Sequence, residues 1–288
     1  MDGRRGGGTV ISDLFALQDP DGGSEPVPDL PRPESAPEIV FDLRPGTPDP
    51  RLFPITDWKR HARWAVDQHD VSYGDPAGIA DLRLVLARWV AKSRGVDASF
   101  RQLTVTSGAQ QAFFLLIATC TVSGDTVSIE DPGYHRFRSV VEAQGARVTP
   151  IPVDDEGIVV DAIPLETKVV YVTPSHQFPT GVTMSMSRRL ALLELARNRG
   201  MLIIEDDYDS EFRYVDRPLE PLYRLDRSGL VAYVASFSKT LSPALRLGCV
   251  VVPRDLLSDL LGLREQVDWA PSQVDQLTLK AYVADGEF

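Results

Sequence analysis

The chain has 288 residues, of which 43% are hydrophobic and 25% charged, so it is long enough to fold as one large domain or two smaller ones with a well-buried core. Its formal net charge is -11, and an acidic surface repels phosphate backbones, which excludes a nucleic-acid-binding surface made by these residues alone. No apolar run is long enough for a membrane span or a signal core, and both cysteines, Cys120 and Cys249, lie in apolar settings, so we expect a soluble cytoplasmic protein.

The first part of the chain reads as a linker. Residues 1–38 are rich in Gly, Pro, Asp and Ser and poor in aromatic side chains, which is typical of a segment that cannot fold alone. A helix is predicted over 58–69. After a turn at 73–78, apolar residues recur at helical spacing over 79–90 and predict a second helix with one buried face.

From residue 103 onward, short β-branched runs alternate with helical patterns. Helices are predicted over 110–120, 134–144 and 187–199. Seven strands are predicted, over 103–106, 126–130, 147–153, 169–173, 202–205, 231–235 and 247–252. Continuous apolar strands separated by helices indicate an α/β fold with a mainly parallel seven-stranded sheet between helices. In such sheets ligands collect beyond the carboxyl ends of the strands.

The segment after the sixth strand carries the first candidate site. Lys239 lies among hydroxyl side chains at a strand end, and Arg246 follows seven residues later. A lysine amine can condense with an aldehyde, while Ser236, Ser238 and Arg246 can hydrogen-bond a phosphate. The same segment could equally be a polar loop with a solvated lysine.

Two other strand ends carry polar groups. The turn of Ser107, Gly108 and Ala109 has no bulky side chain and enters a helix, so a phosphate could approach its free N–H groups; Ser107 could instead be a simple N-cap. After the second strand, the ring of Tyr134 could stack on a flat ligand and Arg136 could bind a carboxylate. Alternatively, Tyr134 is a packing residue and Arg136 a surface charge.

The acidic run over 205–212 follows the fifth strand. Several carboxylates so close invite a metal site, but no His or Cys lies at ligand spacing, so we predict no metal. An aspartate at the end of a buried strand can keep a pyridine nitrogen protonated, and Asp206 is assigned this role, with Tyr208 reaching the ring oxygen. Asp207, on the other face, is expected to be structural or solvated.

In this chain order the sites resemble the fold-type-I pyridoxal-phosphate enzymes, the aspartate aminotransferase superfamily. The chain is most similar to the aminotransferase-like effector domain of the MocR subgroup of GntR transcription regulators. Four segments carry that resemblance: 131–134 (Asp-Pro-Gly-Tyr), 173–181 (Thr-Pro-Ser-His-Gln-Phe-Pro-Thr-Gly), 205–212 (Glu-Asp-Asp-Tyr-Asp-Ser-Glu-Phe) and 236–241 (Ser-Phe-Ser-Lys-Thr-Leu). The resemblance implies a class I/II aminotransferase-like large domain over 39–288.

The resemblance also implies the site roles. Pyridoxal 5'-phosphate would be held by Lys239 as an internal aldimine, with Asp206 on the pyridine nitrogen and Tyr208 on the ring oxygen. Arg136 would bind a ligand carboxylate, and Tyr73 would reach the phosphate of the neighbouring subunit of a homodimer. Tyr134 would stack on the ring, and the implied phosphate contacts are Ser107, Gly108, Ala109, Ser236, Ser238 and Arg246.

The chain departs from the superfamily pattern in two places. Phe178 stands where ordinary aminotransferases have the asparagine of Asn-Pro-x-Gly, so the amide that contacts the ring oxygen is missing, and His176 or Gln177 is the candidate replacement. The helix expected from Arg254 normally leads into a C-terminal small domain, whereas this chain stops at Phe288, so we expect that small domain to be missing. Loss of the small domain would expose apolar surface and remove half of the contacts that bind the substrate.

The N-terminus and the function complete the expectations. Residues 3–10 look like the last wing strand of a GntR-type winged helix, or else form a random basic tail; contact with DNA is expected only through a winged-helix domain absent from this chain. One function is the sensing of pyridoxal phosphate or an amino compound by a transcription regulator. The other is transamination between an amino acid and a 2-oxo acid, in which Lys239 moves the Cα proton. The resemblance favours the regulator and leaves turnover open.

Overall fold

The computed structural model describes residues 2–4, 7–10, 46, 48–212 and 220–286. The chain divides into two units, Met1–Pro45 and Gly46–Phe288. In the first unit, β1 (Asp2–Arg4) and β2 (Gly7–Val10) pair antiparallel. The predicted linker between residue 11 and residue 38 lies outside the described residues.

The second unit is built on an eight-stranded mixed sheet with the order β3-β10-β9-β8-β7-β4-β5-β6. Its strands are β3 (Leu103–Thr106), β4 (Thr126–Asp131), β5 (Arg147–Asp154), β6 (Gly157–Ile158), β7 (Thr167–Val172), β8 (Leu202–Asp207), β9 (Val231–Ser236) and β10 (Gly248–Val251). All seven predicted strands are confirmed. The eighth, β6, has two residues and pairs antiparallel with β5, which is too short for an alternating pattern to reveal.

The central strands are parallel, but β10 runs antiparallel to both β3 and β9. The helices are α1 (Ile55–Gln68), α2 (Ala80–Arg94), α3 (Ala109–Cys120), α4 (His135–Ala143), α5 (Met186–Arg199), α6 (Leu222–Leu225), α7 (Arg254–Val267) and α8 (Gln273–Ala284). The predicted helices agree with these bounds to within four residues, the largest difference being at the end of α2, and α6 and α8 were not predicted. Local signals set several ends: α2 ends at Gly95 in the left-handed conformation, and the Ser185 hydroxyl caps α5.

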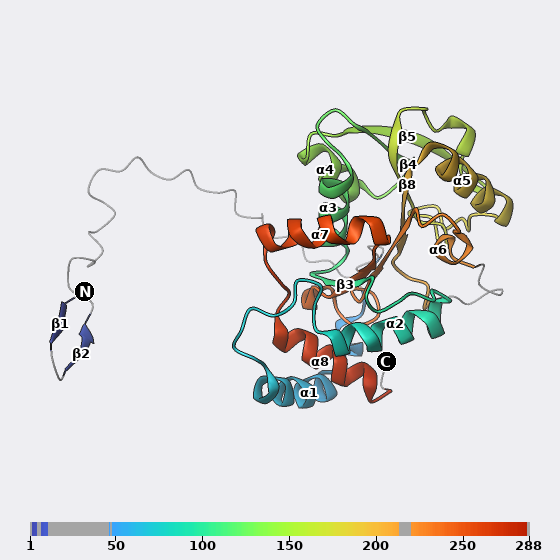
Figure 1. Cartoon of the computed structure of the whole chain (residues 1–288). Coiled ribbons are helices and arrows are strands. Elements are labelled where there is room, and N and C mark those ends of the chain that lie inside the picture. The colour runs from blue at the N-terminus through green and yellow to red at the C-terminus, as the bar shows by residue number, and fades with distance from the viewer. Residues whose placement is uncertain (1, 5–6, 11–45, 47, 213–219, 287–288) are drawn as a thin grey trace, which may run out of the picture. The chain divides into compact units, whose positions relative to one another are not determined.

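Side chains alternate across the sheet, so each strand contributes to two cores. On β9, Ala232 and Val234 join the core under α3, α4 and α7, which we call the first face. Tyr233 and Ala235 point to the second face, where α2 and α8 cover β3, β9 and β10. On that second face, α5 and α6 cover β7 and β8. Figure 1 shows these layers, with α1 lying beside α8.

Register brings the ends of three strands to one edge. Gly248, the first residue of β10, is paired with both Thr106 at the end of β3 and Ser236 at the end of β9. Because β10 is antiparallel, it starts at the edge where its neighbours end. The loops after β3, β8 and β9 therefore meet at the carboxyl edge, where ligands collect in such sheets. Among the described residues, no helix combines the length and the apolarity that a membrane crossing requires.

Candidate functional site

The first part of the site is a group of small and polar residues that we call the cradle: Ser107, Gly108, Ala109, Ser236, Ser238 and Arg246. Arg246 Nη2 donates to the carbonyl oxygen of Ser107 at 2.9 Å, and the hydroxyls of Ser236 and Ser238 lie 3.0 Å apart. A Cβ on Gly248 would lie 3.0 Å from the Gly108 Cα, so β10 packs tightly on the turn. The structure thus brings these predicted residues together.

The turn at Gly108 leaves the first amides of α3 without a side-chain partner. Gly108 is the N-cap residue, with φ 77°, and no side chain of the described residues caps the helix. The backbone N–H of Ser107 donates to Gln111 Oε1 at 2.7 Å, so Ser107 is not the N-cap. A Cβ on Gly108 would lie 2.6 Å from Arg246 Nη2. An uncapped helix start beside a guanidinium is suited to a phosphate group.

The second part of the site is Asp206, at the end of β8 on the first face. It is 5% exposed, and the hydroxyl of Tyr171 donates to its Oδ2 at 2.6 Å. Its Oδ1 is buried and has no hydrogen-bond partner within the described part of the chain. Burial raises the pKa of Asp206 to about 7, against the lowering effect of the Tyr171 hydrogen bond. A buried carboxyl oxygen without a donor is the position where a ligand N–H would be satisfied.

Asp207 faces the opposite side of the sheet and is fully engaged. Its carboxylate accepts hydrogen bonds from Tyr233 and Ser210 and lies 3.5 Å from Arg94 Nη1. Arg94 also donates from Nη1 to the backbone oxygen of Asp207 at 2.6 Å and from Nε to Glu211 Oε1 at 2.9 Å. Of the two expected roles for Asp207, the structural one is therefore correct. Arg94, at the end of α2, was missed by the sequence interpretation.

Lys239 is half-buried in the loop after β9. Burial lowers the pKa of its amine, while the carboxylates of Asp206 and Asp209 oppose that shift. Its Nζ donates a hydrogen bond to the backbone oxygen of Gly46. The lysine is therefore not simply solvated: it lies within the electrostatic field of Asp206 and holds a larger neutral fraction than an exposed lysine.

The rings of Tyr134, Phe178 and Tyr208 form a group of aromatic contacts. The ring of Phe178 is edge-on to Tyr134, with centroids 5.9 Å apart, and edge-on to Tyr208, at 6.2 Å. Gln110 Nε2 donates to the Tyr134 hydroxyl at 3.3 Å. Burial raises the pKa of the Tyr208 hydroxyl, which keeps it protonated and able to donate. Tyr134 therefore has packing contacts, and its stacking on a ligand stays a prediction.

Contacts in the loop after β7 distinguish His176 from Gln177, the two candidates for replacing the missing asparagine amide. Gln177 is 2% exposed, and its Nε2 contacts Glu130 Oε2, Pro132 O and Phe178 O within 3.2 Å, so its amide is used inside the loop. His176 remains a candidate: it is part-exposed, with Nδ1 2.8 Å from Asp209 Oδ2. Glu130, which also accepts from Thr173 and whose pKa burial raises to about 7, was missed by the sequence interpretation.

Two predicted residues lie outside the buried group. Arg136 is exposed on the first turn of α4. Tyr73 is 80% exposed, and its ring centroid lies 5.3 Å from that of Trp269. An exposed tyrosine is available to a second subunit, but that role stays a prediction.

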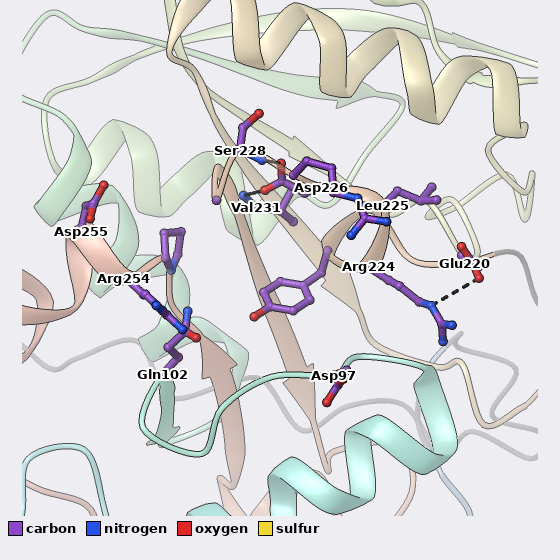
Figure 2. A pocket seen from close by; sticks show the side chains of 14 residues that line it. Asp97, Gln102, Glu220, Arg224, Leu225, Asp226, Ser228, Val231, Arg254 and Asp255 are labelled. Carbon is purple, nitrogen blue, oxygen red and sulfur yellow. Dashed lines mark hydrogen bonds and ion pairs between the residues drawn. The ribbon is translucent and has the colours of Figure 1, made fainter.

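A pocket of about 840 Å³ lies at the opposite, amino-terminal edge of the sheet (Figure 2). Its polar groups serve the local fold. Arg224 Nε lies 3.3 Å from Glu220 Oε1, and the Asp226 carboxylate accepts the backbone N–H groups of Ser228, Leu230 and Val231. Cavity size therefore does not identify the site; the unsatisfied groups at the carboxyl edge do.

Comparison with known proteins identifies the family. Residues 40–287 match the model for aminotransferase class I and II. The chain is 37% identical over 262 residues to an uncharacterized HTH-type transcriptional regulator, YhdI, from Bacillus subtilis (strain 168), covering 88% of this chain and 55% of that protein. It is 34% identical to the probable rhizopine catabolism regulatory protein MocR of Rhizobium meliloti, covering 90% of this chain and 53% of that protein.

Similarity to a solved structure indicates the same family. The crystal structure of an archaeal alanine:glyoxylate aminotransferase superposes with a TM-score of 0.80 at 31% identity, covering 84% of this chain and 63% of that one. The chain spans about half the length of the curated relatives named above. It is an aminotransferase-like domain related both to MocR/GntR-type regulators and to aminotransferases. The chain therefore belongs to the aminotransferase class I and II family, and its cofactor is pyridoxal 5'-phosphate.

Proposed function

We propose that this chain is the effector domain of a MocR/GntR-type transcription regulator, which holds pyridoxal phosphate at the carboxyl edge of the sheet and senses the cofactor or an amino compound there. The observation that carries the proposal is the buried Oδ1 of Asp206, which has no partner among the described residues and lies in the electrostatic reach of Lys239. The regulators among the relatives support the sensing role over turnover. The β1–β2 pair would then belong to the wing of a winged-helix DNA-binding domain.

The residues present fit the cofactor. When bound, pyridoxal phosphate supplies an aldehyde that reacts with amines and a cationic ring that withdraws electrons. Lys239 offers an amine whose pKa is lowered by burial, and the unpartnered Oδ1 of Asp206 would accept the N–H of the pyridine ring. Tyr208 donates to the ring oxygen. The cradle holds the phosphate through the uncapped start of α3, two hydroxyls and the Arg246 guanidinium.

The remaining assignments concern the ring face and the ligand. Tyr134 would cover the ring, and His176, whose Nδ1 lies 2.8 Å from Asp209 Oδ2, would border it. Arg136 binds the carboxylate of an amino compound, and Tyr73 contacts the phosphate held by the partner subunit of a homodimer. These roles need a ligand or a second subunit.

A signal to the rest of the protein can start at Lys239. Its amine donates to the backbone oxygen of Gly46, the residue at which the second unit begins. Engagement with the cofactor would take the Lys239 amine away from that oxygen, and displacement by an amino compound would free the amine to return to it. Ligand binding is thereby coupled to the segment that follows the predicted linker.

The test is a titration with pyridoxal phosphate followed by reduction with borohydride. We expect a new long-wavelength absorbance band and, after reduction and digestion, one modified peptide containing Lys239. Lys239→Ala should lose both, while Lys280→Ala, which removes an amine 2.8 Å from Asp81 on the surface, should keep both. Absence of the band in the unmodified chain would defeat cofactor binding at this site.

Transamination is the second candidate, and the structural similarity to an aminotransferase favours it. In that case Lys239 carries the Cα proton of the substrate, and Asp206 stabilises the protonated ring nitrogen. The two functions are separated by product analysis with an amino acid and a 2-oxo acid at excess. A sensor changes its spectrum without accumulating new 2-oxo acid; many turnovers per chain would favour the enzyme.

A further inference from the structure

The hydroxyl of Tyr171 contacts the same carboxyl that we assign to the cofactor ring. Building on the proposed binding of pyridoxal phosphate at Asp206, we propose that Tyr171 is a positioning residue: it fixes Oδ2 and so leaves Oδ1 as the oxygen that faces the ring nitrogen. The hydroxyl lies 2.6 Å from Oδ2, the short distance typical of a hydrogen bond to a carboxylate. Oδ1 of the same carboxyl is buried and has no partner within the described residues.

The ring of Tyr171 is itself immobilised. It is 1% exposed and stacks on Phe137, with centroids 4.0 Å apart and planes 18° from parallel. Phe113 packs edge-on against it at 5.5 Å. A carboxyl group rotates readily about its terminal bond unless a partner fixes it. A phenol held by two aromatic neighbours therefore sets the orientation of Asp206 from inside the core.

The neighbouring aspartate shows what happens when both oxygens are used. Asp207 Oδ1 accepts from Ser210, and Oδ2 accepts from Tyr233, a buried tyrosine on the strand at the other side of β8. Each aspartate thus has its own tyrosine, one from β7 on the first face and one from β9 on the second. Of these two aspartates, only Asp206 keeps a carboxyl oxygen available to a ligand.

The direction of the proton supports the assignment. Burial and the Asp206 charge raise the pKa of the Tyr171 hydroxyl, so the proton stays on the phenol and the phenol donates. The donated hydrogen bond lowers the pKa of Asp206 against the larger effect of burial, which favours the carboxylate form. A carboxylate, unlike a neutral carboxyl, can pair with a protonated pyridine nitrogen.

The test compares two ligands that differ only at the ring nitrogen: pyridoxal phosphate and its deaza analogue, in which carbon replaces that nitrogen. For each variant the ratio of the two dissociation constants measures the contribution of the Asp206 contact. Effects on packing, phosphate binding and aldehyde binding cancel in the ratio, because both ligands share those groups. The readout requires binding alone and no turnover.

We expect the wild type to prefer pyridoxal phosphate, and Tyr171→Phe, which keeps the aromatic packing, to reduce that preference about tenfold, the scale of one hydrogen bond to a charged group. Tyr233→Phe is the matched control and should leave the preference unchanged. In an Asp206→Asn background, Tyr171→Phe should have no further effect, because the contact through which it acts is gone.

The outcomes distinguish a failure of the Tyr171 positioning role from a failure of the proposed function. If the wild type binds pyridoxal phosphate with a clear preference and Tyr171→Phe keeps it, or if Tyr233→Phe lowers it equally, the positioning role is wrong while the proposed function stands. If the wild type binds neither ligand, the proposed function is wrong and this inference falls with it. A variant that melts below the assay temperature is measured at a lower temperature, and additive effects of Tyr171→Phe and Asp206→Asn on the preference overturn the positioning role.

Discussion

Replacement of Arg94 by methionine tests whether the second face of β8 is held by charge pairing. The guanidinium lies 3.5 Å from Asp207 Oδ2 and donates to Glu211 Oε1 at 2.9 Å and to the Asp207 backbone oxygen at 2.6 Å. The Arg94 side chain is 1% exposed and that of Asp207 is 3% exposed. Methionine retains an apolar stem but not the guanidinium carbon, which lies 4.8 Å from the Trp89 ring centroid, so the variant removes the charge and its contacts more than volume.

The magnitude follows from the group that is left behind. Without Arg94, the buried carboxylate of Asp207 loses its cation, and removing one partner of a buried ion pair lowers the free energy of unfolding by about 3–5 kcal/mol. For a domain of this size that corresponds to a fall in Tm of about 10 °C. A further Asp207→Asn substitution should restore part of the loss, because the unpaired charge is removed.

The assay is urea unfolding followed by circular dichroism, with Arg138→Met as the matched control. Arg138 Nη1 lies 3.9 Å from Glu142 Oε1 on the surface of α4, and both side chains are more than 40% exposed. An exposed pair of this kind contributes about 0–1 kcal/mol. If Arg94→Met lowers the free energy of unfolding no more than the control does, the pairing does not stabilise this face and the reasoning is refuted.

The pH dependence of stability and the role of Gly108 give the remaining predictions. Burial raises the pKa values of Glu130, Glu205 and Asp206 to about 7, so the folded cofactor-free protein binds protons that the unfolded chain releases above about pH 4. Its free energy of unfolding should therefore fall as the pH rises from 5 to 8. Urea titrations that show a rise would contradict this. Gly108→Ala should weaken pyridoxal phosphate binding in an absorbance titration, because φ 77° disfavours a side chain and a Cβ would lie 2.6 Å from Arg246 Nη2. Gly124→Ala, at φ 91° with no atom of the described residues within 4 Å of an added Cβ, should lower stability alone. Equal affinities for the two variants would show that the cradle geometry is not required.

The sequence was sufficient to predict the strands and the candidate site residues near their ends. Short β-branched apolar runs separated by helical patterns predicted all seven longer strands, because a strand buried on both faces is apolar throughout. Lys239, Asp206 and the cradle could be proposed because each lies at or near a strand end, and parallel strands end at one edge. The direction of β10 was not predictable from its four buried residues, since an apolar run has the same pattern in either direction.

Tertiary structure decided what supports those residues. Tyr171 in the middle of a buried strand looks like any core aromatic, and its partner Asp206 lies 35 positions away. Arg94 and Glu211 are 117 positions apart, and Glu130 and Gln177 are 47 apart. The choice between His176 and Gln177 also needed the loop contacts. The sequence by itself determined which chemical groups reach the edge of the sheet, because an apolar run and the residues at its end are neighbours along the chain. Only the folded structure determined which oxygen of each carboxyl is satisfied, because hydrogen bonding depends on distances between residues that the chain order does not contain.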